Sequence, residues 1–453
     1  MKSIDQIKND ISNKNITVLG AGISGQGASN LANYLGANVL LSNNKKHKHL
    51  NLSSDKIKIE FSHSEKCLKS DLVIISPGIN PNNSVIINKI NKQRIPIVSE
   101  IEFGSWFTNS PIIAVTGSNG KSTVVRILYD IFNDNYQNVL LGGNIGVSFC
   151  MNIYKELKNN FKYSLHILEL SSFQLQKIFQ FKPSLACILN VTKDHLDRHG
   201  NFNNYFNDKL NIVKNYDKNS LIVYNQDDSN LKKYFSSNKN AIPFSIVNKN
   251  NLFNKSNKIY SSKTKKLIID QNQTKLIGEH NLSNLIASIQ IAKLFNIDNK
   301  SINNALINFK PLEHRMEIIK VNKNILFIND SKGTNLFSTK SALDSFKSGI
   351  ILILGGYSKE NITKIDIENL VDKQKIEFVI CYGAVGKKLS EIIALYKKTI
   401  YKNKFSSAIK YALKIAYENN VVLLSPGFKS FDQFKNFEQR GNKFKEMIHK
   451  YYA

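Results

Sequence analysis

Short apolar runs alternate with longer amphipathic segments along most of the chain, and this alternation predicts parallel strands joined by helices. In the first hundred residues, it predicts strands at 16–19, 37–41 and 71–75 and a helix at 26–35. A glycine-rich segment at 20–25 separates the first strand from that helix and fits a dinucleotide-type fingerprint. We therefore predict a small Rossmann-like domain at the N-terminus.

The fingerprint alone does not predict a nicotinamide cofactor. An NAD site usually has an acidic residue about 20 positions after the glycines, where it holds the ribose hydroxyls. This chain has Ser42 and Asn43 there. A hydride-transferring dehydrogenase is therefore disfavoured, although the glycines remain suited to another diphosphate.

A second glycine loop follows the apolar run at 112–115 and precedes a helical segment that starts at 124. Backbone N–H groups at such a helix start can surround phosphates, a lysine adds charge, and a hydroxyl can bind Mg²⁺. The loop is shorter than the usual P-loop, because Val115 stands where the first glycine of that motif would be. We predict ATP binding by Gly117, Ser118, Asn119, Gly120, Lys121, Ser122 and Thr123.

The remaining pattern completes an α/β organisation. Strands are predicted at 165–168 and 185–189, short strands and loops at 232–275, and further strands at 325–328, 350–354, 378–381 and 421–424. A helix predicted over 201–214 leaves Lys209 beside its buried face, where a lysine is usually solvated or snorkels. We expect three α/β domains: a Rossmann-like one at 1–104, a P-loop-type ATPase at 105–310 and a Rossmann-like one at 311–453.

Composition narrows the function classes. The 453 residues carry a formal net charge of +27, but the lysines alternate with asparagines instead of clustering with aromatic residues. We therefore expect no nucleic-acid partner. With no apolar run near the ~20 residues of a membrane span, we expect a cytoplasmic monomer without membrane insertion. The four cysteines have no metal or disulfide spacing and are predicted to be core residues.

Seven ordered motifs, at 116–123, 142–146, 169–175, 190–199, 278–281, 313–315 and 330–335, resemble those of the Mur ligases of peptidoglycan synthesis. The segment 425–441 is similar to the ending found in the branch that adds D-glutamate. The resemblance implies an ATP-dependent amide ligation through an acyl phosphate. Its substrates would be UDP-N-acetylmuramoyl-L-alanine, glutamate and ATP, with two Mg²⁺ ions.

The resemblance also implies site residues. The catalytic set would be Lys121, Glu169, His195, Lys209 and Lys332, and the metal ligands would be Ser122, Glu169, His195 and Lys209 as a carbamate. Outside the loop, ATP would contact Asn281, Asn284, Arg315 and Asp330. The UDP substrate would contact Gly20, Gly22, Gly25, Ser42, Asn43, Asn144 and Ser171, and glutamate would contact Thr334, Lys359, Ser430 and Phe437.

Three departures from the family pattern keep alternatives open. Asp208 replaces a small residue before Lys209, and an acidic residue often found at 42–43 is missing. Phe428 and Lys429 follow Gly427 where the family has small residues, which leaves the choice between D- and L-glutamate open. A folate polyglutamate synthase would not need the N-terminal unit, while a non-catalytic nucleotide-binding protein would not need Lys121, Glu169 or Lys209.

Overall fold

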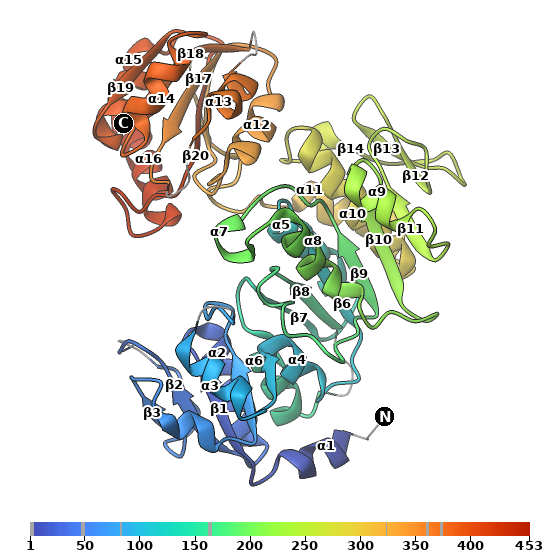
Figure 1. The fold of residues 1–453 in the computed structure, drawn as a ribbon. Helices are drawn as coiled ribbons and strands as arrows, with labels where there is room; N and C mark the ends of the chain where they lie inside the picture. Colours follow the sequence, from blue (N-terminus) through green and yellow to red (C-terminus); the bar gives the residue numbers. More distant parts are fainter. Residues whose placement is uncertain are drawn as a thin grey trace. The chain divides into compact units, whose positions relative to one another are not determined.

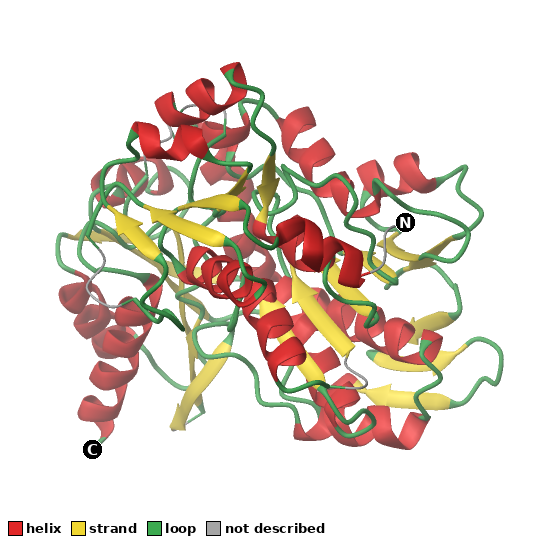
Figure 2. Cartoon of the chain, turned by 90° about the horizontal axis from the view of Figure 1, so that it is seen from below, coloured by secondary structure: helices red, strands yellow, loops and turns green. Residues whose placement is uncertain are grey.

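Parallel sheets with helices packed against them dominate the structure, a computed structural model (Figures 1 and 2). It describes residues 4–46, 50–81, 84–161, 165–322, 324–358, 362–371 and 375–453. The chain forms two compact units, Met1–Ile268 with Asn284–Leu306, and Ile269–Ser283 with Ile307–Ala453. The boundary near 307 lies close to the predicted one at 310. The predicted boundary at 104 falls inside the first unit, so its division into two domains stays a prediction.

The first sheet has the strand order β3-β2-β1-β4-β5, and all its pairings are parallel. Its strands are mostly apolar because helices cover both faces. The order reverses at β1, so the glycine segment after β1 lies at the carboxyl edge where α/β sheets bind ligands. The elements are α1 (Ile4–Ile11), β1 (Asn15–Leu19), α2 (Ile23–Tyr34), β2 (Asn38–Ser42), β3 (Lys58–Glu60), η1 (Glu65–Lys69), β4 (Leu72–Ile75), α3 (Val85–Lys92), β5 (Ile97–Ser99) and α4 (Glu100–Ser105).

The second sheet, also parallel, has the order β11-β10-β9-β6-β8-β7. Its order reverses at β6, which places the second glycine loop at the corresponding edge. The elements are β6 (Ile112–Thr116), α5 (Lys121–Asn133), β7 (Val139–Gly143), α6 (Phe149–Lys158), β8 (Leu165–Glu169), β9 (Leu185–Ile188), α7 (Leu196–His199), α8 (Phe202–Leu210), η2 (Asn211–Val213), β10 (Leu221–Asn225), α9 (Ser229–Phe235) and β11 (Ala241–Phe244).

Short strands follow, as predicted for the polar stretch at 232–275. A three-stranded sheet has the order β12-β13-β14, and long helices come after it. These elements are β12 (Leu252–Lys255), β13 (Lys258–Ser261), β14 (Leu267–Asp270), η3 (Gln271–Gln273), α10 (Glu279–Leu294) and α11 (Asn299–Asn308).

The sheet of the second unit has the order β15-β16-β20-β17-β18-β19 and is parallel except for the β15–β16 pair. The predicted strands correspond to β16, β17, β18 and β20, whereas the two outer strands, β15 and β19, were not predicted. The elements are β15 (Glu317–Asn322), β16 (Ile325–Asn329), α12 (Leu336–Asp344), β17 (Ile350–Gly355), α13 (Lys364–Val371), β18 (Ile376–Tyr382), α14 (Gly386–Ile393), β19 (Thr399–Lys402), α15 (Phe405–Ile415), β20 (Val421–Gly427) and α16 (Phe437–Tyr452).

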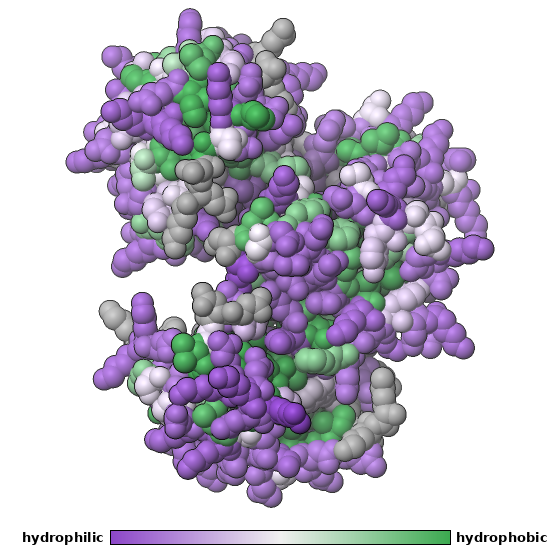
Figure 3. Space-filling view, in the orientation of Figure 1, coloured by the Kyte–Doolittle hydropathy of each residue, from purple (hydrophilic) through white to green (hydrophobic). Residues whose placement is uncertain are grey.

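The burial of the cysteines agrees with their prediction as core residues. All four cysteines are buried and unpaired. The faces in view of Figure 3 are mostly hydrophilic, with scattered apolar patches. Within the described ranges, no helix combines the length and apolar character needed to cross a bilayer.

Candidate functional site

The loop between β6 and α5 is held in a shape that requires glycine. Gly120 precedes α5 with φ = 86°, a left-handed conformation that residues with a side chain rarely adopt. A Cβ there would also collide with Oδ1 of Asn284. The Lys121 ammonium donates to the carbonyl oxygens of Gly117 (2.7 Å) and Ser118 (2.9 Å). The loop therefore gathers a lysine and the amino end of a 13-residue helix at one edge of the sheet.

Glu169 ends β8, directly beside the β6 strand that leads into the loop. Its side chain is buried, and Oε1 accepts a hydrogen bond from Nδ2 of Asn144 at 2.8 Å. Oε2 is buried without a hydrogen-bond partner. A buried carboxylate oxygen with no partner is costly, and a bound cation would satisfy it. Glu169 therefore fits the predicted Mg²⁺ site.

The other predicted metal ligands are of mixed type. Ser122 is buried in the first turn of α5. His195 has φ = 53°, and its side chain is 43% exposed and 3.8 Å from a carboxylate oxygen of Asp194. The described part of the chain contains no group of three or more His, Cys, Asp or Glu side chains placed to hold a metal ion. To bind Mg²⁺, the predicted ligand set would therefore need the Ser122 hydroxyl and a carbamate on Lys209 in addition to Glu169 and His195.

Lys209 is where the structure corrects a sequence expectation. A solvated or snorkelling lysine was the usual interpretation, but this side chain is 2% exposed. Its Nζ donates to the Gly117 carbonyl at 2.9 Å, the same oxygen that Lys121 contacts. Burial, with Lys121 nearby, holds the pKa of Lys209 well below its ordinary value. The fold therefore brings to the glycine loop a buried amine whose lowered pKa favours the neutral form.

Asp208 has a structural partner that explains its departure from the family pattern. Its Oδ2 lies 2.8 Å from Nδ1 of His199 and accepts from Nε2 of Gln176 at 3.0 Å. The other ring nitrogen of His199 is 3.0 Å from the Ser172 hydroxyl. Asp208 thus orients His199 and Gln176, two residues for which the sequence pattern indicates no role.

A cavity of about 480 Å³ joins the first glycine segment to β7 and the turn after β8. Of the predicted UDP-substrate residues, Gly20, Gly22, Asn43 and Asn144 line it, and Gly25, Ser42 and Ser171 do not. Gly25 instead allows close packing, because a Cβ there would collide with the carbonyl oxygen of Gly20. Ser171 hydrogen-bonds the Gln174 side chain at 3.0 Å, and Gln174 lines the cavity.

Arg198 connects this cavity to the second sheet. Its guanidinium donates to the carbonyl of Ile79, a lining residue, at 2.8 Å and lies 3.9 Å from the ring centroid of Phe173. The glycine segment, Asn144 and the α7 region therefore meet within the first unit.

In the second unit, Asp330 and Lys332 follow β16. Asp330 accepts from the Ser425 hydroxyl at 2.7 Å, and burial raises its pKa to about 7. The backbone N–H of Lys332 donates to the His314 carbonyl at 3.0 Å, and its ammonium lies 5.2 Å from the ring centroid of Phe437. Lys332 and Phe437, predicted for catalysis and glutamate binding, are thus neighbours.

The other residues of this unit that are predicted to bind ATP or glutamate differ in burial and in their contacts. Ser430 is buried and Thr334 partly buried. Arg315 lies close enough to Asp330 to act on its pKa, and Asn281 donates to the Ile277 carbonyl at 2.8 Å. Lys359 lies outside the described residues.

Arg440 lies in the segment 425–441, and the sequence pattern by itself indicates no role for it. It is fully buried and donates to the Ser331 hydroxyl (3.0 Å), the Ser331 carbonyl (2.7 Å) and the Phe428 carbonyl (3.0 Å). It therefore fixes the segment before Lys332 against the end of β20. An arginine two residues after a helix-starting Asn-Phe-Glu was a signal too weak to interpret alone.

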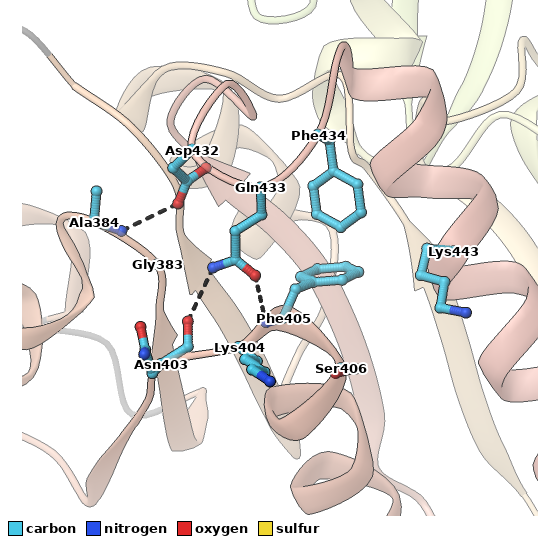
Figure 4. A pocket seen from close by; sticks show the side chains of 10 residues that line it. All are labelled: Gly383, Ala384, Asn403, Lys404, Phe405, Ser406, Asp432, Gln433, Phe434 and Lys443. Carbon is cyan, nitrogen blue, oxygen red and sulfur yellow. Dashed lines mark hydrogen bonds between the residues drawn. The ribbon is translucent and has the colours of Figure 1, made fainter.

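The segment after β20 contains Phe428, which stands where the family has a small residue. Phe428 is 6% exposed and packs in the apolar core of the unit. The segment then borders a cavity of about 660 Å³ (Figure 4), where Oε1 of Gln433 accepts from the Phe405 N–H and Asp432 accepts from the Ala384 N–H. Phe428 is therefore a core residue.

Two family models match the chain in order. The Mur ligase middle domain matches residues 115–292, and the Mur ligase, glutamate ligase domain matches residues 314–428.

Curated relatives match nearly end to end. A protein of Christiangramia forsetii named UDP-N-acetylmuramoylalanine–D-glutamate ligase is 36% identical over 96% of this chain and 99% of its own length. One of Buchnera aphidicola with the same name is 38% identical over 95% of this chain and 97% of its length.

Solved structures share the fold at low identity. A pseudomurein peptide ligase type C from Methanothermus fervidus has a TM-score of 0.61 and 19% identity, covering 96% of this chain and 100% of that one. The UDP-N-acetylmuramate-alanine ligase of Thermotoga maritima has a TM-score of 0.59 and 18% identity, covering 97% and 100%. The two curated relatives are 36% and 38% identical to this chain over almost their whole length, and two Mur ligase family models match it; the chain therefore belongs to the Mur ligase family.

Proposed function

We propose that this protein ligates D-glutamate to UDP-N-acetylmuramoyl-L-alanine with ATP in the synthesis of peptidoglycan precursors. A carboxylate oxygen of the muramoyl substrate attacks the γ-phosphorus of ATP, ADP leaves, and an acyl phosphate forms. The amine of glutamate then attacks the acyl carbon, and phosphate leaves as the amide forms and the amine loses a proton. The observation that carries the proposal is the glycine loop with Lys121, Lys209 and the unpartnered Glu169 oxygen at one sheet edge.

The loop supports a role in phosphate binding. Three anionic groups must approach one another in this reaction, so positioning and charge neutralisation supply most of the catalysis. Lys121 would exchange its two carbonyl partners for the β- and γ-phosphates, and the first turn of α5 would offer its N–H groups. Asn284, beside Gly120, would lie at the nucleotide, and in the second unit Asn281, Arg315 and Asp330 would contribute further contacts.

Ser122, Glu169, His195 and a carbamate on Lys209 would hold the Mg²⁺ ions. When bound, Mg²⁺ would neutralise charge on the phosphate oxygens. The lowered pKa of Lys209 supports the carbamate, because only a neutral amine attacks CO₂. In that step the nitrogen of the neutral amine bonds to the carbon of CO₂ and releases one proton, leaving a negatively charged carbamate.

The cavity lined by Gly20, Gly22, Asn43 and Asn144 would take the UDP-muramoyl substrate. In the second unit, Lys332, Thr334, Ser430 and Phe437, together with Lys359, would hold glutamate. Cations and hydroxyl groups suit its two carboxylates. The burial of Phe428 supports an unaltered glutamate pocket.

The test is phosphate release with Mg²⁺-ATP and UDP-N-acetylmuramoyl-L-alanine, comparing D-glutamate, L-glutamate and no amino acid. We expect release that depends on D-glutamate and falls at least about 100-fold in Lys121→Ala. Dependence on L-glutamate would mean a changed stereochemical preference. Release that depends on neither amino acid, or that survives Lys121→Ala, would contradict the ligase assignment.

A further inference from the structure

A polar network joins the carboxyl ends of β2 and β3 in the first unit. The Ser42 hydroxyl lies 2.7 Å from Oε1 of Glu60 and 2.7 Å from Nδ1 of His63. Glu60 also accepts from the hydroxyl and the backbone N–H of Ser64, at 2.6 and 2.9 Å. Glu60 thus supplies, from the neighbouring strand, a carboxylate that residues 42–43 lack.

The donor and the acceptor of each hydrogen bond in this network can be assigned in one consistent way. Burial acts to raise the pKa of Glu60, but the hydrogen bonds from Ser64, Ser42 and Cys67 outweigh it, and the pKa is lowered. An ionised carboxylate only accepts, so the single Ser42 proton points to Glu60. The Ser42 oxygen must then accept from Nδ1–H of His63. Burial lowers the pKa of His63 against the opposing effect of Glu60, so the ring is neutral and Nε2 carries a lone pair.

The network lies beside the cavity. Asn43, next to Ser42, lines it and accepts from the Ala21 N–H of the glycine segment at 3.2 Å. In Rossmann-type sheets a diphosphate lies at the glycine segment, and the end of the second strand faces the nucleoside. His63 is only partly buried, so its ring can be reached.

We propose that Nε2 of His63 accepts the N3–H of a uracil base, and that Ser42 and Glu60 act as positioning residues that fix the ring's tautomer. The proposal rests on the proposed UDP-linked substrate. Uracil carries a donor at N3, whereas cytosine carries an acceptor there. An acceptor-only nitrogen therefore selects uracil and repels cytosine through two facing lone pairs.

The experiment is calorimetric titration of the full chain with UDP, CDP, N3-methyl-UDP and 2′-deoxy-UDP. The wild type should bind UDP about three- to tenfold more tightly than CDP or N3-methyl-UDP, and 2′-deoxy-UDP as tightly as UDP. His63→Phe should abolish the preference for UDP over CDP. Ser42→Ala, which keeps the imidazole but frees its tautomer, should reduce that preference.

Melting temperature and ATP binding serve as controls for folding. A network with only a structural role would weaken all four ligands equally in both variants, which would overturn the proposal. If 2′-deoxy-UDP were the only ligand that bound more weakly than UDP, the proposal would also be overturned, because the contact would then be to the ribose and not to the base. If the chain binds no UDP, the proposed function fails as well, whereas UDP binding without base preference contradicts this inference only.

Discussion

At the scale of single residues, burial decides which ionisable groups can do chemistry. Lys209 and Glu169 are charged residue types that reach the interior at 2% exposure each. Burial lowers the pKa of Lys209 well below its ordinary value, and it leaves Oε2 of Glu169 without a hydrogen-bond partner. Both groups belong to the proposed active site.

A carbamate on Lys209 is directly observable. Protein equilibrated with ¹³C-bicarbonate should give a carbamate carbon resonance in the wild type, because burial lowers the pKa of the amine and favours the neutral form that attacks CO₂. Lys209→Arg, which keeps a cation but cannot form the carbamate, should lack the resonance and release phosphate at least about 100-fold more slowly. Equal spectra for the two proteins would contradict the proposed ligand.

Glu100 predicts a pH dependence of stability away from the site. It is 1% exposed, and burial raises its pKa from 4.5 to about 7, while Oε2 has no partner. The folded state therefore holds the proton more tightly, and stability present below pH 4.5 is lost as the pH rises through about 7.

Glu100→Gln cannot ionise, so it should lose about 1–3 kcal/mol less folding free energy than the wild type between pH 5 and pH 8. Denaturant titrations of both proteins at the two pH values measure this difference. A parallel decline in the two would show that Glu100 is not the group responsible.

At the scale of elements, loops at strand ends are held by side chains from distant segments. Gln433 accepts from the Phe405 N–H at the start of α15 and donates to the Asn403 carbonyl, both at 2.9 Å (Figure 4). It thereby caps a helix and fixes the segment between Ser430 and Phe437. Two residues proposed for glutamate binding depend on that segment.

Gln433→Ala should raise the KM for glutamate several-fold and lower stability by about 1 kcal/mol, the usual effect of losing a helix cap. The KM for ATP should not change, because the partners of the Gln433 side chain, Phe405 and Asn403, are not among the proposed ATP contacts. Gln433→Glu, which keeps the acceptor for the Phe405 N–H but loses the donor to the Asn403 carbonyl, is the comparison variant and should recover only part of the stability. An unchanged KM for glutamate in Gln433→Ala would separate this loop from the acceptor site.

At the scale of the whole molecule, the proposed reaction draws on both compact units. Lys121 and Lys209 belong to the first unit, and Lys332 to the second. Water must be excluded from an acyl phosphate, which favours closure of the units around the substrates.

Small-angle scattering should therefore show a smaller radius of gyration when a non-hydrolysable ATP analogue and the muramoyl substrate are both present. Lys121→Ala, with weakened phosphate binding, should contract less at the same concentrations. Identical dimensions with and without ligands would contradict closure.

The sequence by itself determined the α/β class, most of the strands and both glycine loops, because these depend on local periodicity and on backbone conformations that only glycine adopts easily. It also determined the Mur ligase family, through motifs that keep their order. The tertiary structure alone decided that Lys209 is buried, that Asp208 orients His199, that Phe428 is a core residue, and that Glu60 and His63 meet Ser42. Arg440 and Ser331 are 109 positions apart. Contacts of this kind depend on which strands lie side by side and which side chains lose water, and no local pattern encodes either.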